Sequence, residues 1–177
     1  MPPEHPPEPA VPAVPGVRQA VRQAVRALLV TPDERVLLIR TAIPQRPGTH
    51  LHLTPGGGVE PGEHALEALR RELLEETGRD GFDVGPEVWR RTHTYRWATK
   101  IVTQAERYFV VRTPAFDPVP QAGIPDLDDF LAFRWWSAAE LAASAEHFVP
   151  YRLPALLPAL LAALRLGRPP APFDVGA

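Results

Sequence analysis

The sequence predicts an α/β protein, in which β-strands and α-helices alternate along one domain. Three observations indicate this class. Apolar, β-branched runs such as Val21–Val30 and Val36–Arg40 are typical of strands. The segment from Glu63 to Gly78 has the apolar periodicity of a helix, and so does the Leu- and Ala-rich segment Tyr151–Leu166. With 177 residues, 45% hydrophobic and 23% charged, the chain has the size and composition of a single globular domain.

The first expected element is a β-hairpin. Its strands, Val21–Val30 and Val36–Arg40, are joined by Thr31–Arg35, where Pro and Asp favour a turn. The beginning of the first run, Val21–Arg26, also fits a short helix, and periodicity alone leaves both interpretations open. Leu51–Thr54 follows a loop and is expected to be a short strand.

A glycine-rich loop and a helix come next and form the central stretch of the sequence. Gly56–Gly58 allow positive φ angles and a close approach of another group to the backbone. Leu66, Leu69 and Leu73 then recur on one helical stripe, which is predicted to be buried. The helix is expected to end at Gly78, because glycine favours the left-handed conformation that follows a last helical turn.

Three carboxylates share a face of this helix. Glu72, Glu75 and Glu76 lie at i, i+3 and i+4, within about one turn. They fit a solvated face on which Arg71 forms ordinary ion pairs with Glu67 and Glu75, each worth about 0.2–0.5 kcal/mol. They equally fit a site where a cation cancels the repulsion between Glu72 and Glu76. The spacing alone does not decide between these interpretations.

The chemistry of such a cation follows from its donors. Clustered carboxylates in a chain without cysteine favour a hard divalent ion, Mg²⁺ or Mn²⁺, over zinc or copper. Magnesium keeps bound waters and binds the phosphates of substrates. The glycine-rich loop would let such phosphates approach the backbone.

The loop and the helix also carry a fixed spacing of residues, with five between Gly57 and Glu63 and seven between Glu63 and Arg71. This pattern resembles the signature of the Nudix hydrolases. It departs from the family at Arg79, where an aliphatic residue is usual, a position that concerns packing at the helix end. The resemblance implies a Nudix-type α/β fold, with a mixed β-sheet sandwiched between helices. The matching residues are Gly57, Glu63, Arg71, Glu72, Leu73, Glu75, Glu76 and Gly78.

The resemblance also implies roles for individual residues. Arg71 would orient the carboxylates, and Gly57 would serve the geometry of the loop. The attacking water would give its proton to Glu75, Glu76 or Glu106, and the sequence does not decide which. The implied metal ligands are Glu63, Glu72, Glu75, Glu76 and the carbonyl of Gly56.

Two further strands are expected at Val88–Tyr95 and Ile101–Thr113, after a connection from the helix. Their basic side chains either face solvent or point toward the glutamate helix, where arginine binds phosphate oxygens through two donors. Arg91 and Arg107 are the candidates for this contact. Tyr95 is a third candidate for substrate binding, because some relatives that act on dinucleoside polyphosphates have a Tyr shortly after the signature.

Glu106 lies inside the second of these strands, where β-propensity disfavours glutamate. Many members of the family have an additional carboxylate outside the signature that serves as metal ligand or base. Glu106 therefore fits either that role or an exposed strand charge, and both stay open. Asp126, Asp128 and Asp129 in the following loop compete for the same role.

The C-terminal third is expected to complete the domain. Pro114–Asp129 reads as a long loop, and Phe130–Trp136 as a strand. Ser137 and Glu140 form a predicted capping box at the start of a helix. Tyr151–Leu166 is the expected terminal helix.

Three parts of the chain are expected: a Pro-rich disordered tail over residues 1–19, the Nudix domain over 20–167, and a loose tail over 168–177. The sequence has no cysteine, no signal peptide and no apolar run that would span a bilayer, so we expect a cytoplasmic protein. The net charge of -2 gives no reason to expect a membrane or a stable nucleic-acid partner. A homodimer is left open.

Together these features predict a metal-dependent Nudix pyrophosphohydrolase. Its substrate would be a nucleotide-type small molecule, a nucleoside diphosphate joined to another group, attacked at phosphorus by an activated water. The alternative is a Nudix module that binds a nucleotide without cleaving it. The intact glutamates argue against that alternative, because binding alone does not need all of them.

Overall fold

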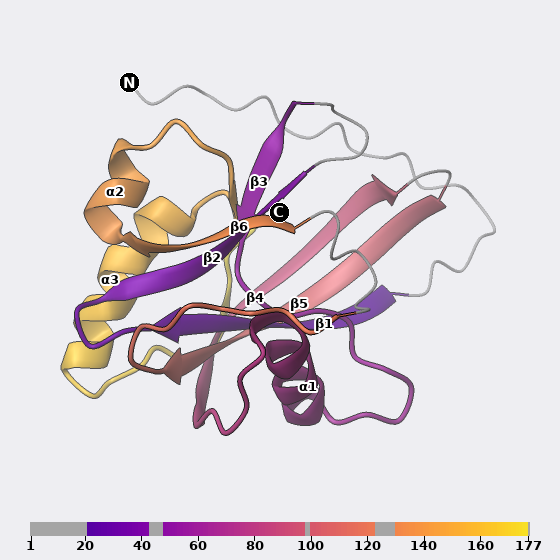
Figure 1. The fold of residues 1–177 in the computed structure, drawn as a ribbon, viewed down its shortest axis with the longest axis horizontal. Coiled ribbons are helices and arrows are strands. Elements are labelled where there is room, and N and C mark those ends of the chain that lie inside the picture. The colour runs from indigo at the N-terminus through magenta and orange to yellow at the C-terminus, as the bar shows by residue number, and fades with distance from the viewer. Residues whose placement is uncertain (1–20, 43–47, 98–99, 123–129, 177) are drawn as a thin grey trace.

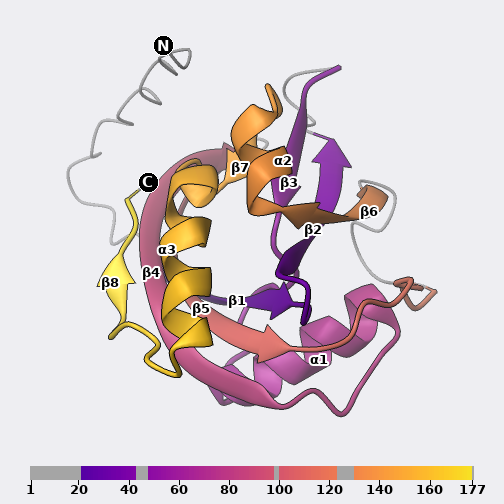
Figure 2. The same cartoon turned by 90° about the vertical axis from the view of Figure 1, so that its left-hand side faces the viewer.

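A computed structural model describes residues 21–42, 48–97, 100–122 and 130–176. Their strands form one strongly curved mixed sheet with helices on both faces, which confirms the predicted fold class (Figures 1 and 2). The strands are β1 (Val21–Val30), β2 (Arg35–Ala42), β3 (His50–Leu53), β4 (Val84–Trp97), β5 (Lys100–Arg112), β6 (Phe130–Ser137), β7 (Phe148–Val149) and β8 (Phe173–Asp174). The helices are α1 (Ala65–Thr77), α2 (Ala138–Ala143) and α3 (Leu153–Arg165). The strand order is β7-β3-β2-β1-β5-β4-β8, and β6 pairs with β2.

The predicted N-terminal hairpin is present. β1 and β2 are antiparallel and meet at the pair Val30 and Val36. The alternative of a short helix over Val21–Arg26 is wrong, because β1 pairs in parallel with β5 along its whole length. Away from the turn, the other edge of β1 is occupied by the glycine-rich loop. There the Ala27 N–H donates to the carbonyl of Pro55 at 2.7 Å.

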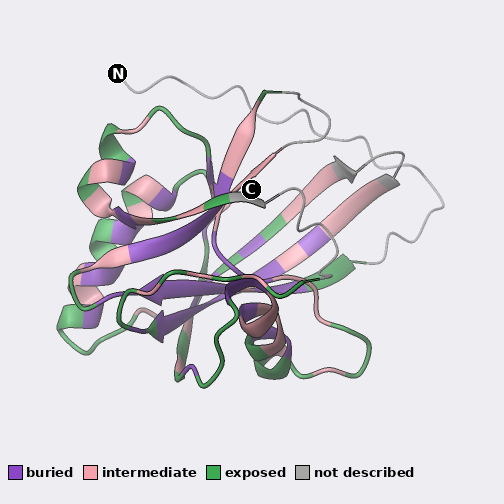
Figure 3. Cartoon of the chain, viewed as in Figure 1, coloured by how far each residue is buried: buried purple, intermediate pink, exposed green. Residues whose placement is uncertain are grey.

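Two apolar clusters lie on opposite faces of the sheet. Side chains of β1 alternate between them, so that Val25 packs beneath α1 and Leu28 packs beneath α3. Figure 2 shows α1 and α3 on these two faces, and Figure 3 shows that each of these helices has both buried and exposed residues. Leu69 and Leu73 are fully buried, as predicted. Leu66 is not buried as predicted, because its side chain is 37% exposed in the first turn of α1.

The C-terminal third follows the prediction closely. Ser137 caps α2, and its hydroxyl accepts a hydrogen bond from the N–H of Glu140, whose carboxylate returns to the N–H of Ser137. The expected terminal helix is α3, which packs its leucines into the cluster on the α3 face. No helix in the described part of the chain is both long and apolar enough to cross a membrane.

The C-terminal segment was expected to be loose, and this is wrong for the part around β8. Phe173 and Asp174 pair in parallel with Trp89 and Arg90 of β4. Val175 is fully buried against the α3 cluster. The physical reason is that the outer edge of β4 carries backbone groups that need partners, and the tail supplies them.

Some expectations concern residues outside the described part. The Pro-rich tail over residues 1–19 is one of them. Asp126, Asp128 and Asp129, which compete with Glu106 in the sequence, also lie outside the described residues.

Docking of the C-terminal tail leads to a testable expectation. Val175→Ala removes buried methyl groups and should lower the free energy of unfolding by about 2 kcal/mol. Phe173→Ala changes a side chain that is 42% exposed and should cost less than about 0.5 kcal/mol. Urea unfolding of both variants measures the difference. Equal small effects would mean that the tail does not dock in solution.

Candidate active site

Helix α1 is fixed at both ends by its neighbours. At its start, the carboxylate of Glu67 accepts from the N–H of His64, which forms a capping box. At its end, Gly78 has the predicted left-handed conformation, with φ 68°. The loop after β5 then binds the last turn, since the N–H of Gln121 donates to the carbonyl of Glu75 at 2.8 Å. The carboxylates of α1 are therefore held on a rigid element.

Arg71 is the centre of the acidic cluster. Its Nη1 atom donates to Glu72 Oε1 at 2.9 Å and to Glu75 Oε2 at 3.3 Å, and the second contact is the one that helical spacing predicts. Its Nε atom donates to Glu63 Oε1 at 2.9 Å, and Nη2 donates to the carbonyl of Gly58. Arg71 holds the pKa of Glu63 below its usual value. One guanidinium thus joins the loop, Glu63 and two helical carboxylates.

Glu76 belongs to the same helix but is buried. It follows Leu69 by seven residues and Leu73 by three, so it falls in the apolar stripe of α1. Its Oε2 atom accepts from the N–H of Gly56 at 2.7 Å. Burial raises the pKa of Glu76 to about 8, and the carboxylates of Glu72 and Glu75 act in the same direction.

The glycines of the loop are required by close packing. A Cβ on Gly57 would lie 2.5 Å from the carboxylate of Glu72. A Cβ on Gly56, whose φ is 129°, would lie 2.2 Å from the carbonyl oxygen of Val25. Burial raises the pKa of Glu72, although the hydrogen bond from Arg71 opposes this. The loop therefore lies directly against the acidic face of α1.

Glu106 lies on the other face of the sheet and is not an exposed strand charge. Its side chain is 1% exposed, and four donors surround its carboxylate. Burial alone would raise the pKa of Glu106, but Arg26 and Arg91 hold it well below its usual range. The carboxylate is therefore ionised inside the protein. Its hydrogen-bond donors are Arg26 Nε at 3.0 Å, Gln104 Nε2 at 2.9 Å, Arg91 Nη1 at 3.1 Å and the Tyr108 hydroxyl at 2.7 Å.

Arg26 joins this network to the acidic cluster. Its Nη1 atom donates to the carbonyl of Gly56, the residue whose N–H binds Glu76. Arg26 and Glu106 are 80 residues apart and meet because β1 and β5 are neighbouring strands. The loop at the edge of β1 is thus bound from both faces of the sheet at one residue, Gly56.

The structure separates the predicted substrate-binding residues. Arg91 lies beside Glu106 and is almost fully buried. Tyr95 stacks on His93 with ring centroids 5.1 Å apart, on the same face of β4 as Arg91. Arg107 lies on the opposite face of the sheet, where its guanidinium binds Glu87 at 2.6 Å. Arg91 and Tyr95 are therefore brought together, and Arg107 is not.

Sequence reasoning missed Arg26, Gln104 and Tyr108 as members of the site. A signal for Arg26 was present, because it is a charged residue in the middle of an apolar strand, at a position that alternates with core residues. The sequence also gave Arg79 as a departure from the Nudix signature. Its guanidinium carbon lies 4.9 Å from the ring centroid of Phe116 and 5.6 Å from that of Phe82, so the effect is on packing at the helix end, as expected.

The residues present fit a divalent cation by charge and donor type. In the part of the chain that the structure describes, no three His, Asp or Glu side chains are already arranged as a metal-binding group. Arg71 and Arg26 instead provide the positive charge around the acids. The raised pKa values of Glu72 and Glu76 indicate that this compensation is incomplete. A cation bound by carboxylates and the Gly56 carbonyl would complete it.

The glycine loop packs on clustered glutamates and lies beside buried arginines. This arrangement is typical of proteins that bind phosphate groups with a divalent cation. The chain belongs to the NUDIX domain family, whose model matches residues 20–156. The prediction drawn from the signature is thereby confirmed. Members of this family generally use divalent metal ions and act on nucleotide-type substrates.

Known proteins similar to this chain support the assignment. An RNA pyrophosphohydrolase of Pectobacterium atrosepticum is 28% identical over 147 residues, which cover 72% of this chain and 83% of that protein. An RNA pyrophosphohydrolase of Shigella boydii is 31% identical over 105 residues, so the match spans 52% of this chain and only 60% of that relative's length. The fold resembles a C. elegans Ap4A hydrolase, with a TM-score of 0.58, 19% identity, and coverage of 81% of this chain and 99% of that one.

The two glycines lead to contrasting expectations. Gly57→Ala meets only the end of a flexible side chain, so the free energy of unfolding should change by less than about 1 kcal/mol while Mn²⁺ binding is lost. Gly56→Ala meets backbone at a positive φ and should lower that free energy by more than about 2 kcal/mol. Urea unfolding and electron paramagnetic resonance of bound Mn²⁺ measure both. Unchanged Mn²⁺ binding by Gly57→Ala would contradict this assignment.

The buried Glu76 leads to a pH dependence. Its pKa is raised from 4.5 to about 8, so its contribution to stability is present below about pH 4.5 and is lost as the pH rises toward 8. We expect the free energy of unfolding of the metal-free protein to fall over this window. Glu76→Gln should fall less, because its side chain does not ionise. Urea unfolding at about pH 5 and about pH 8 tests this, and parallel pH profiles would contradict it.

Proposed function

We propose that this chain is a Nudix pyrophosphohydrolase that hydrolyses a diphosphate linkage in a nucleoside diphosphate derivative, using Mg²⁺ or Mn²⁺. The observation that carries this proposal is the pair of contacts at Gly56, whose N–H donates to Glu76 and whose carbonyl accepts from Arg26. On the same helix as Glu76, Glu72 and Glu75 share the guanidinium of Arg71. Carboxylate and carbonyl oxygens are the donors that these ions prefer.

The residues take the following roles in the proposal. When bound, the cation neutralises charge on the phosphate oxygens and lowers the pKa of the attacking water. Arg71 keeps Glu72 and Glu75 oriented through its hydrogen bonds. Glu75 and Glu76 are the candidates to accept the proton of that water, since Glu106 is already bound by four donors. The ligands would be Glu72, Glu75, Glu76 and the Gly56 carbonyl, with Glu63 assisting.

The substrate is proposed by class. A nucleoside triphosphate, a dinucleoside polyphosphate and a nucleotide sugar each contain the required linkage. A 5′-triphosphorylated RNA end joins them, because the Pectobacterium and Shigella relatives are RNA pyrophosphohydrolases. Arg91 and Tyr95 are proposed to contact the substrate, since they share the sheet face that carries Glu106. Arg107 stays a weaker candidate because Glu87 binds its guanidinium.

The proposal extends to the location and the partners of the protein. A cytoplasmic location, the absence of a stable nucleic-acid partner and the possibility of a homodimer rest on the sequence. The non-hydrolytic binding module is the alternative function, and the complete set of glutamates around Arg71 argues against it. Release of pyrophosphate, phosphate or mononucleotide from the four substrate classes, with Mg²⁺ or Mn²⁺, separates the two functions.

Replacement of the central carboxylates tests the proposal. Glu75→Gln and Glu76→Gln should each lower kcat by at least about 100-fold while the protein stays folded, because each removes a ligand charge or the proton acceptor. Glu60→Gln is the matched control, since Glu60 is an exposed glutamate of the same signature. Steady-state hydrolysis and thermal unfolding are measured together. Full turnover in both cluster variants would refute the assigned roles.

A further inference from the structure

Arg26 is held firmly in place by its ion pair with Glu106 on the neighbouring strand. Its partner Glu106 is 1% exposed and is fixed in turn by Gln104, Arg91 and Tyr108. A carboxylate with four donors has no freedom to turn away. The Nε edge of the Arg26 guanidinium therefore has a fixed direction.

Within the described part of the chain, the Nη2 group of the same guanidinium is free. Among the described residues, Arg26 forms hydrogen bonds only through Nε and Nη1, to Glu106 and to the Gly56 carbonyl. The donors of Nη2 are therefore available, and the side chain is 15% exposed rather than sealed in the core. A planar guanidinium that is anchored through Nε and Nη1 and keeps the donors of Nη2 free is suited to bind an oxyanion.

The Arg26 guanidinium lies beside the proposed metal site, where a phosphate of the substrate would bind. It is next to the Gly56 carbonyl, and the N–H of this residue binds Glu76 of the acidic cluster. On the same sheet face, two buried nitrogen atoms in the described part of the chain lack a hydrogen-bond partner, namely Arg91 Nε and His93 Nδ1. Arg26 thus lies between the carboxylates of α1 and these two nitrogen atoms.

We infer that Arg26 binds a phosphate oxygen of the substrate, and that Glu106 is the positioning residue that holds Arg26 for this contact. The inference rests on the proposed function, because it assigns a residue to the substrate of that same site. Glu106 then acts through Arg26, neither as metal ligand nor as base. The alternative is a purely structural role, in which the buried ion pair of Arg26 and Glu106 only stabilises the sheet.

Binding of inorganic pyrophosphate in the presence of Mn²⁺ tests the inference by isothermal titration calorimetry. Arg26→Ala should weaken pyrophosphate binding about 10- to 100-fold, the range expected for a lost charged hydrogen bond. Its affinity for Mn²⁺ alone should stay within about 3-fold of wild type, because Arg26 is not a metal ligand. Arg26→Lys keeps a charge in the core and guards against a folding defect. It should show a smaller loss than Arg26→Ala because the charge is kept, and a loss should remain because an ammonium does not span both Glu106 and the phosphate.

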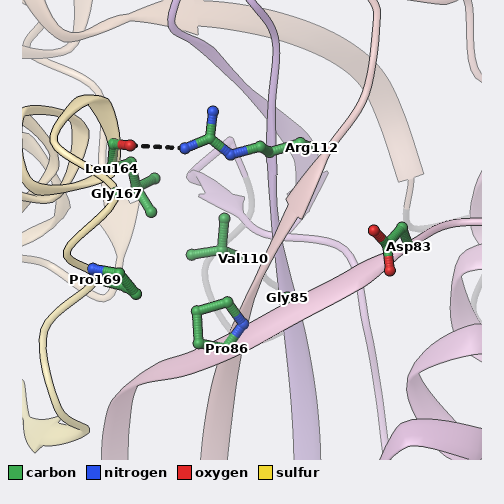
Figure 4. Close-up of a pocket in the computed structure, with 8 residues that line it drawn as sticks. All are labelled: Asp83, Gly85, Pro86, Val110, Arg112, Leu164, Gly167 and Pro169. Carbon is green, nitrogen blue, oxygen red and sulfur yellow. Dashed lines mark hydrogen bonds between the residues drawn. The ribbon is translucent and has the colours of Figure 1, made fainter.

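Arg112→Ala is the matched control. Figure 4 shows Arg112 at the end of β5, where its guanidinium donates to the carbonyl of Leu164 at 2.8 Å. It therefore binds a backbone carbonyl as Arg26 does, in a hollow between β4, β5 and the end of α3. Arg112→Ala should leave pyrophosphate binding and turnover unchanged.

Glu106→Gln tests the positioning role. It should weaken pyrophosphate binding in the same direction as Arg26→Ala, and the double variant should bind no more weakly than Arg26→Ala alone. If Glu106 is instead a base, Glu106→Gln will lose turnover and keep its pyrophosphate affinity, which overturns the positioning role.

The remaining outcomes separate this inference from the proposed function. If wild type and Arg26→Ala bind pyrophosphate equally well, while wild type hydrolyses a substrate, only the inference fails. If wild type hydrolyses no member of the substrate panel and binds no pyrophosphate, the proposed function fails as well.

Discussion

The backbone of Gly56 is the constraint on which the site depends. Its N–H is bound by Glu76 from one face of the sheet, and its carbonyl is bound by Arg26 from the other. Neither contact is possible unless the backbone passes within hydrogen-bond distance of both. A side chain at this position would collide with β1, so glycine is the residue that permits the arrangement. The helix, the loop and the central strands are fixed relative to one another at this single unit.

Two buried glutamates meet there with opposite electrostatics. Burial raises the pKa of Glu76 to about 8, although the Gly56 N–H and Arg26 oppose the shift. Glu106 is at least as well shielded from water, yet two arginines hold its pKa well below the usual range. The same residue type is thus a compensated anion on one side of the loop and an under-compensated one on the other. In the proposed site, a divalent cation would add positive charge beside Glu76, whereas Glu106 already has its counter-charges.

The curvature of the sheet explains how these groups gather. β1 pairs with β2 only near the turn and with β5 along its whole length, so the glycine loop takes up the edge that β2 leaves. The α1 cluster and the α3 cluster then occupy separate faces, and a loop at the edge can contact both. The long strands β4 and β5 bring Arg91 and Tyr95 onto the Glu106 face, whereas Arg107 falls on the other face because strand side chains alternate.

The sequence by itself determined the local parts of this protein. Helical spacing places Arg71 against Glu72 and Glu75, and glycine and capping residues set the ends of α1 and α2, because these effects act within a few residues. Tertiary structure decided what the sequence left open. Arg26 and Glu106 meet only through the parallel register of β1 and β5, and the tail folds back only because β4 has a free edge. Pairings between distant strands depend on packing of the whole chain, which no local pattern encodes.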